Sequence, residues 1–228
     1  MKTNIPERIA ALREAMKQHK IDAYIIPTSD PHMSEYPADC WKYREWISGF
    51  TGSAGTVIIT ADKAGLWTDS RYFLQASTQL EGTGIELFKM MLPETPTIPA
   101  FLTHELKEGQ TVGLNGETYS LADARSLEKA LAEKEIKLNT NASLIDPIWK
   151  ERPASREAPM FEMPVELSGK STEDKLIDIN KMLHKAGADC TILSALDEVA
   201  WTFNIRGTDV AYNPVVISYA FVSEKESV

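Results

Sequence analysis

The sequence predicts an α/β protein in which helices cover a largely buried sheet, followed by a linker and a truncated second copy of the same fold. Three observations predict this. Apolar strands alternate with amphipathic helices over residues 6–142, a proline-rich stretch without periodicity follows over 143–170, and blocks of the first part recur after residue 171. Strands that alternate with helices are typical of layered α/β domains.

The expected elements follow in order along the chain. A proline opens the first helix, which ends near His19. Further helices are expected after Asp69 and over residues 97–107. Another helix opens at Ser120, because Asp123 three positions later completes a capping-box pattern. Apolar strands are expected at residues 22–27, 56–60, 64–68, 85–90, 111–115 and 135–139.

Composition and charge exclude several classes of protein. Hydrophobic residues make up 43% and charged residues 25% of the chain, as in soluble globular proteins. The net charge of −9 disfavours nucleic acid and anionic membranes as partners, since both would be repelled. No apolar run approaches the roughly 20 residues of a membrane span, and no leader is evident. The two cysteines, Cys40 and Cys190, are typical of a reduced, cytoplasmic protein.

Similar blocks recur at a nearly fixed spacing. Asp22 and Asp189 lie 167 positions apart, whereas Trp46 and Trp201 lie 155 apart, which indicates an insertion of 12 residues in the first copy. Such self-similarity favours two copies of one fold, and chance matching of short apolar blocks is the alternative. The first copy continues long after its "TVIIT" strand, so we expect the second to be incomplete. The predicted division is a first domain over 1–142, a linker over 143–170 and the start of a second domain over 171–228.

One polar loop collects residue types that bind metals. Asp30, His32, Glu35, Asp39 and Cys40 all lie in "SDPHMSEYPADCW". None of the firm zinc or calcium spacings is present, and a catalytic metal usually needs three protein ligands with supporting partners. We therefore favour this loop as the wall of a cleft over a metal site.

A second loop, "SGFTGSAGT", is rich in glycine and invites comparison with phosphate-binding loops. It lacks the Lys-Ser/Thr ending of such a loop and precedes a strand instead of a helix. Gly49, Gly52 and Gly55 are therefore interpreted as residues that let the chain turn. No complete catalytic constellation is found anywhere in the sequence.

The stretch "GLWTDSRYFLQAS" contains an arginine that local physics does not explain. Asp69 or Ser70 is a good N-cap for the following helix, because its side-chain oxygen can accept from a free backbone amide. Arg71 then lies in the first turn, where a positive charge opposes the helix dipole. The cap thus leaves Arg71 without a role.

Four longer motifs follow one another along the chain: "DPHMSEYPADCWKYREWISGFTGSAGT", "WTDSRYFLQA", "LIDPIWKERP" and "ALDEVAWTFNIRGTDVAYNPV". Together they resemble the N-terminal region of the Xaa-Pro aminopeptidase (aminopeptidase P) family of the creatinase/prolidase superfamily. The resemblance implies a creatinase N-terminal-like domain, with a mixed β-sheet flanked by helices, ahead of a partial second copy. It also implies that Arg71 binds the peptide substrate. The alternative is that Arg71 only pairs with Asp69 or another nearby carboxylate.

The resemblance further implies what the complete enzyme does. Such enzymes are cytoplasmic homodimers that remove an N-terminal residue preceding proline, using two divalent metal ions, usually manganese, held by a C-terminal catalytic domain. Nothing in this sequence matches that ligand set, so we expect no catalytic residue and no metal in this chain, and no activity from it alone. A stand-alone binding or dimerisation module with the same fold is the alternative function.

Overall fold

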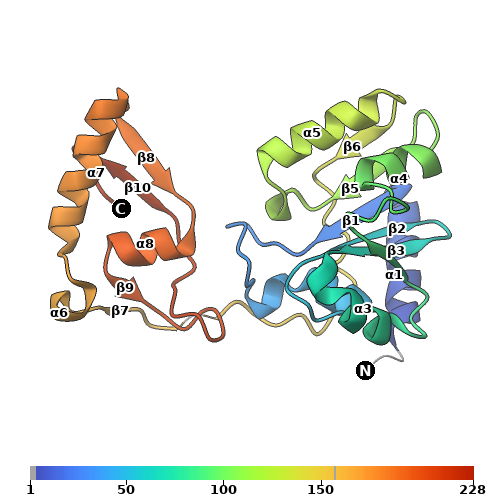
Figure 1. The fold of residues 1–228 in the computed structure, drawn as a ribbon, viewed down its shortest axis with the longest axis horizontal. Helices are drawn as coiled ribbons and strands as arrows, with labels where there is room; N and C mark the ends of the chain where they lie inside the picture. Colours follow the sequence, from blue (N-terminus) through green and yellow to red (C-terminus); the bar gives the residue numbers. More distant parts are fainter. Residues whose placement is uncertain (1–3, 157) are drawn as a thin grey trace. The chain divides into compact units, whose positions relative to one another are not determined.

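The computed structural model describes residues 4–156 and 158–228, which form two compact units. The first contains the chain up to Glu35 together with Cys40–Pro153. The second contains Tyr36–Asp39 and Ala154–Val228. Each unit is described by itself below (Figure 1).

The first unit is built on a six-stranded sheet. Its strands lie in the order β4-β3-β2-β1-β5-β6. β2 is antiparallel to both β1 and β3, whereas β4 is parallel to β3, and β5 is parallel to both β1 and β6. The sheet is therefore mixed, as the resemblance implied. The bounds are β1 Ala23–Pro27, β2 Thr56–Thr60, β3 Ala64–Thr68, β4 Glu86–Lys89, β5 Thr111–Leu114 and β6 Lys137–Asn139.

Helices cover both faces of this sheet (Figure 1). One face packs against α1, α2 and α3, and the other against α4 and α5. The bounds are α1 Ile5–Gln18, α2 Tyr43–Ser48, α3 Phe73–Leu80, α4 Ile98–Glu105 and α5 Leu121–Ala132. Short 3-10 turns lie at Asp39–Trp41, Ser70–Tyr72 and Gly116–Thr118.

The alternation of side chains along β1 shows how the two cores form. Tyr24 and Ile26 point to the core beneath α1, whereas Ala23 and Ile25 point to the core beneath α4 and α5. Successive residues of a strand face opposite sides of a sheet, so a strand covered on both sides must be apolar throughout. The predicted α/β layering is confirmed.

Serine side chains cap two of the helices, and the helix start predicted at Ser120 is confirmed. The Ser120 hydroxyl accepts from the backbone nitrogen of Asp123 at 3.0 Å, and Ser171 accepts from Asp174 in the same way at 3.1 Å. Each serine thus supplies the acceptor for one of the free amides of its first turn. None of the helices in the described residues is both long and apolar enough to cross a membrane.

Residues just after 142 pack onto the first unit. Leu144, Ile145 and Trp149 are buried in its core, and the Trp149 ring stacks on Trp46 with centroids 5.3 Å apart. The compact unit consequently extends to Pro153, although the sequence around it has the prolines and weak periodicity of a linker. The predicted domain division, with boundaries at 142 and 170, stays a prediction.

The second unit contains two small antiparallel sheets, in which β8 pairs with β10 and β7 with β9. Its long helix α7 ends at Ala186 and is capped by Gly187, which has the left-handed backbone that favours glycine. The bounds are β7 Phe161–Glu162, α6 Val165–Ser168, α7 Thr172–Ala186, β8 Cys190–Leu193, α8 Leu196–Thr202, β9 Ile205–Arg206 and β10 Ala220–Ser223.

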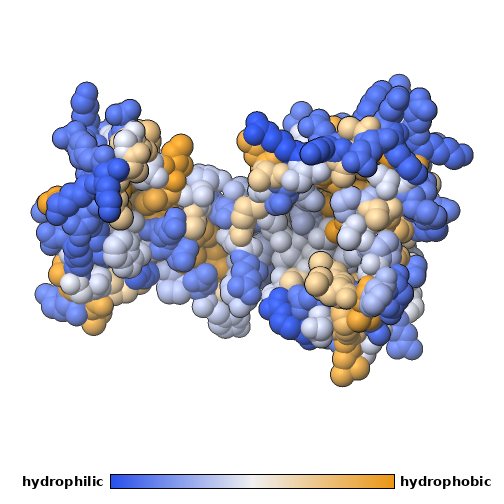
Figure 2. Space-filling view, turned by 45° about the horizontal axis from the view of Figure 1, so that its top comes forward, coloured by the Kyte–Doolittle hydropathy of each residue, from blue (hydrophilic) through white to orange (hydrophobic). Residues whose placement is uncertain are grey.

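The second unit leaves many apolar side chains exposed. Figure 2 shows hydrophobic patches at the surface of an otherwise largely hydrophilic exterior. In the second unit the exposed large hydrophobic side chains include Ile177 and Met182 of α7, Ile192 of β8 and Trp201 of α8. Its buried hydrophobic core is correspondingly small.

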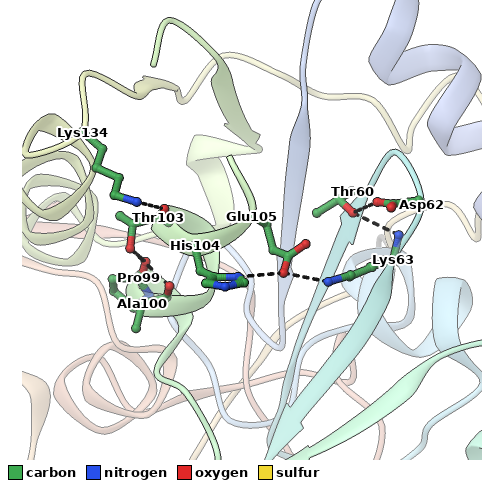
Figure 3. Close-up of polar contacts among 9 residues, drawn as sticks. All are labelled: Thr60, Asp62, Lys63, Pro99, Ala100, Thr103, His104, Glu105 and Lys134. Atoms are coloured by element: carbon green, nitrogen blue, oxygen red, sulfur yellow. Dashed lines mark hydrogen bonds and ion pairs between the residues drawn. The ribbon is translucent and has the colours of Figure 1, made fainter. Parts of the chain in front are cut away.

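An ion pair ties the β2–β3 hairpin to the end of α4 (Figure 3). The Lys63 ammonium lies 2.7 Å from the Glu105 carboxylate, which the His104 imidazole also contacts at 3.1 Å. Figure 3 shows the Thr60 hydroxyl closing the hairpin turn through Asp62 and the backbone of Lys63. The Lys63–Glu105 pair therefore holds the end of α4 against the turn of the β2–β3 hairpin.

Candidate functional site

Arg71 lies just beyond the carboxyl end of β3. The Thr68 hydroxyl, at the end of this strand, donates to the Ala54 carbonyl at 2.7 Å, and the Met90 backbone nitrogen donates to the Thr68 carbonyl at 3.0 Å. The chain then turns at Asp69 into the 3-10 turn Ser70–Tyr72, and α3 begins only at Phe73. The expected helix after Asp69 is thus present, but its first turn is 3-10.

The carboxylate of Asp69 both caps this turn and holds the Arg71 guanidinium. Its Oδ1 accepts from the backbone nitrogen of Arg71 at 3.0 Å and from Nε at 2.9 Å. Its Oδ2 accepts from Nη2 at 2.9 Å. The local pairing weighed in the sequence analysis is therefore present, in the bidentate geometry that suits arginine and carboxylate.

The pair remains open to solvent on one side. The side chains of Arg71 and Asp69 are 61% and 33% exposed. Hydrogen bonding to Asp69 raises the pKa of Arg71, and hydrogen bonding to Arg71 lowers the pKa of Asp69, so both groups stay charged at neutral pH. Among the described residues, nothing accepts a hydrogen bond from Nη1 of Arg71. A polar edge of the guanidinium is thus available to a ligand.

Tyr72 supports Arg71 from the side. The Arg71 guanidinium carbon lies 5.2 Å from the centre of the Tyr72 ring. The Tyr72 phenol shares a 2.8 Å hydrogen bond with the Ser53 hydroxyl, and its ring meets the edge of Phe50. The hydrogen bond with Ser53 and the charge of Arg71 lower the pKa of the phenol. The orientation of Arg71 therefore depends on the loop 49–55.

A buried arginine fixes that loop. Arg44 of α2, only 5% exposed, donates from Nε to the Thr28 hydroxyl at 2.9 Å. Its Nη1 donates to the Phe50 carbonyl at 2.5 Å, and its Nη2 donates to the Gly52 carbonyl. Burial lowers the pKa of Arg44 to about 10. Nothing in the sequence pattern around Arg44 distinguishes an inward-facing arginine from an exposed one, so its role was not predictable from the sequence.

The glycines of the loop have structural roles. Gly49 ends α2 with a φ of 71°, a left-handed conformation. A Cβ on Gly52 would lie 2.3 Å from the Phe50 ring, and one on Gly55 would lie 3.1 Å from the Trp67 carbonyl. A phosphate-binding loop presents backbone N–H groups, whereas this loop points carbonyls at Arg44. The interpretation that these glycines shape a turn is supported.

The polar loop "SDPHMSEYPADCW", residues 29–41, does not have the arrangement of a metal site among its described side chains. Asp30 is buried, and its Oδ1 accepts from the backbone nitrogens of His32 and Ser34, each at 2.9 Å. This carboxylate is committed to closing its own turn. Over residues 4–156 and 158–228, no group of three or more His, Cys, Asp or Glu side chains is arranged to hold a metal ion. These residues do not fit a pair of divalent ions.

Comparison with known proteins identifies the family. Two models described as "Creatinase/Prolidase N-terminal domain" match residues 8–147 and 151–228. Proteins named "Probable Xaa-Pro aminopeptidase P" from Laccaria bicolor and Neosartorya fischeri are 44% and 42% identical over 98% and 96% of this chain. The X-prolyl aminopeptidase of Caenorhabditis elegans, a cytosolic enzyme with a di-nuclear active site, matches 99% of the chain with a TM-score of 0.93 and 31% identity.

The matched regions are parts of longer proteins. This chain spans 35% of the Laccaria protein, 34% of the Neosartorya protein and 38% of the Caenorhabditis enzyme. The resemblance recognised from the four motifs is confirmed, as is the succession of two domains of this kind. The chain belongs to the creatinase/prolidase N-terminal domain family.

Proposed function

We propose that this chain is the N-terminal part of a Xaa-Pro aminopeptidase, a hydrolase that removes an N-terminal residue preceding proline. The observation that carries the proposal is the match of 99% of this chain to the Caenorhabditis enzyme, at a TM-score of 0.93 and 31% identity. A match of this extent includes both units and the turn that bears Arg71. The N-terminal part shapes the substrate cleft and has no catalytic residue of its own.

The metal chemistry belongs to the longer protein. The related enzyme with a di-nuclear active site supports two divalent ions, and we propose that they are manganese. When bound, such ions activate water for attack on the peptide bond. Because the described residues do not fit a metal pair, we expect this chain by itself to bind none and to be inactive.

This chain would contribute a peptide contact through Arg71. The guanidinium is exposed, held in one orientation by Asp69, and retains an unbound polar edge. A fixed fork of donors suits a peptide carbonyl or carboxylate. We further propose that the longer protein is a cytoplasmic homodimer, divided into domains at the predicted boundaries.

The experiment compares two peptides that differ at one residue. The full-length protein, loaded with manganese, should release the first residue from a tripeptide with proline in second position, and only weakly from the same tripeptide with alanine there. The 228-residue chain should release nothing from either. Equal cleavage of both peptides by the full-length protein, or none, would contradict the proposal, and turnover by the short chain would contradict the assignment of the metals.

The alternative of a stand-alone binding module is not favoured. The relatives are named as aminopeptidases, and this chain aligns with about a third of their length. Continuation of the reading frame beyond Val228 into two aspartates, a histidine and two glutamates at metal-binding positions would exclude the module. A natural stop codon there would exclude the enzyme.

A further inference from the structure

The two edges of the Arg71 guanidinium have different surroundings. Asp69 occupies the side-on edge, where Nε and one N–H of Nη2 point. The end-on edge, formed by Nη1 and the second N–H of Nη2, contacts no acceptor among the described residues. A ligand that reaches Arg71 can therefore use only this end-on edge.

Capping alone does not explain this arrangement. An N-cap needs one side-chain oxygen to accept from a backbone amide, and serine or asparagine serves as well as aspartate. Here Oδ1 already accepts from the Arg71 backbone, while Oδ2 contacts only the guanidinium. The second oxygen of Asp69 is therefore not needed for the cap, and its contact with Nη2 fixes the orientation of the Arg71 guanidinium.

The charge of Asp69 beside Arg71 determines whether a neutral or a negatively charged ligand group binds more tightly. Asp69 neutralises the guanidinium at hydrogen-bond distance, so the Arg71–Asp69 pair carries no net charge. An incoming carboxylate would be repelled by Asp69, whereas a neutral carbonyl oxygen still gains the hydrogen bonds of the free edge.

We propose that Asp69 is a positioning and specificity residue, which aims the free edge of Arg71 so that its N–H groups donate to a neutral backbone carbonyl of the peptide in preference to a terminal carboxylate. The proposal rests on the proposed function in taking a peptide as the ligand and Arg71 as the residue that contacts it. It predicts that the charge of Asp69, and not its capping ability, sets the preference.

The test measures equilibrium binding of two peptide analogues to the full-length protein. Both are tripeptides with proline in second position and a reduced, non-hydrolysable bond before it. One ends in a carboxamide and the other in a free carboxylate. The readout is the ratio of the two dissociation constants, because contributions from the rest of the cleft cancel when variants are compared. Turnover of the corresponding cleavable peptides is measured in parallel.

Three variants separate the possible roles of Asp69. Asp69→Asn removes the charge, and Asp69→Ser keeps a good cap while removing the fork to Arg71. Glu128→Gln removes one charge from the exposed face of α5, and so controls for net charge. We expect the preference for the amide to fall about fivefold in both Asp69 variants at low salt, less at high salt, and not in Glu128→Gln.

Each outcome bears on a separate claim. If the ratio stays at the wild-type value in Asp69→Asn and Asp69→Ser while the full-length protein still cleaves Xaa-Pro peptides, the inference is wrong and the proposed function stands. If the ratio changes as expected but no peptide is cleaved, the inference stands and the function is wrong. If neither analogue binds, both are wrong.

Discussion

The guanidinium of Arg44 contacts Phe50 twice. Its Nη1 donates to the Phe50 carbonyl at 2.5 Å, and its Cζ lies 4.7 Å from the centre of the Phe50 ring. The same ring meets the edge of Tyr72, on which Arg71 rests. A buried arginine on α2 thus determines, through one phenylalanine, where the exposed arginine of the site lies.

Replacement of Arg44 should destabilise the first unit. Arg44→Met leaves the Phe50 and Gly52 carbonyls without their buried donors, a loss of about 2–4 kcal/mol in the free energy of unfolding. Arg44→Lys should be intermediate, because a lysine keeps the charge but lacks the planar fork. Thermal unfolding of the chain measures the effect, with Arg125→Met on the exposed side of α5 as the control. Equal melting of Arg44→Met and Arg125→Met would show that the loop does not depend on Arg44.

A methyl group at Gly52 should disturb both the loop and the site. A Cβ there would lie 2.3 Å from Cζ of Phe50 and 2.7 Å from Cδ1 of Tyr72. Overpacking of this kind costs about 1–3 kcal/mol, and the displaced Tyr72 would move Arg71 with it. Gly52→Ala should therefore lower the melting temperature and weaken peptide binding by the full-length protein. Ser126→Ala, at an exposed position of α5, is the control. A Gly52→Ala protein with the same melting temperature and peptide affinity as Ser126→Ala would show that the added methyl group is not crowded.

The Lys63–Glu105 pair predicts a pH dependence of stability. The hydrogen bond from Lys63 lowers the pKa of Glu105, whose side chain is 14% exposed. A carboxylate with a folded-state pKa below its unfolded value stabilises the fold above the unfolded pKa, near 4.3, and loses that contribution as the pH falls through the folded pKa. Glu105→Gln should therefore melt about 1–3 °C lower than wild type at pH 7, with a smaller difference at pH 3.

The control for this prediction is Glu108→Gln, since Glu108 is exposed in the connection that follows α4, three residues after Glu105. It should melt like wild type at both pH values. A difference between wild type and Glu105→Gln that persists unchanged at pH 3 would mean that packing, and not the charge of Glu105, is responsible.

The α/β layers of the fold could be predicted from the sequence alone. Strands buried on both faces are apolar throughout, as in "AYIIP" and "AGLWT", and helix starts carry their own caps, as at Ser120. These are local signals, readable without knowledge of the neighbours. Gly52 and Gly207 lie 155 positions apart, as Trp46 and Trp201 do, and a Cβ at either glycine would lie within 2.7 Å of a side chain.

What the sequence did not reveal depends on long-range packing. Residues 143–153 have the prolines of a linker, yet Trp149 is buried against Trp46, about a hundred positions earlier. Arg44 faces inward because three acceptors converge on it, the Thr28 hydroxyl after β1 and two carbonyls of the loop 49–55. Arg71 was found through a family motif, whereas its bidentate contact with Asp69 required the 3-10 turn that the structure shows.

The central claim, that Arg71 binds the peptide, is tested most directly by Arg71→Ala in the full-length protein, with kcat and KM measured on an Xaa-Pro tripeptide and thermal stability measured alongside. The account predicts a kcat/KM lower by about tenfold or more, mainly through a raised KM, and an almost unchanged melting temperature, because the exposed pair with Asp69 contributes little to stability. An unchanged kcat/KM together with a large loss of thermal stability would contradict it and leave Arg71 with a structural role only.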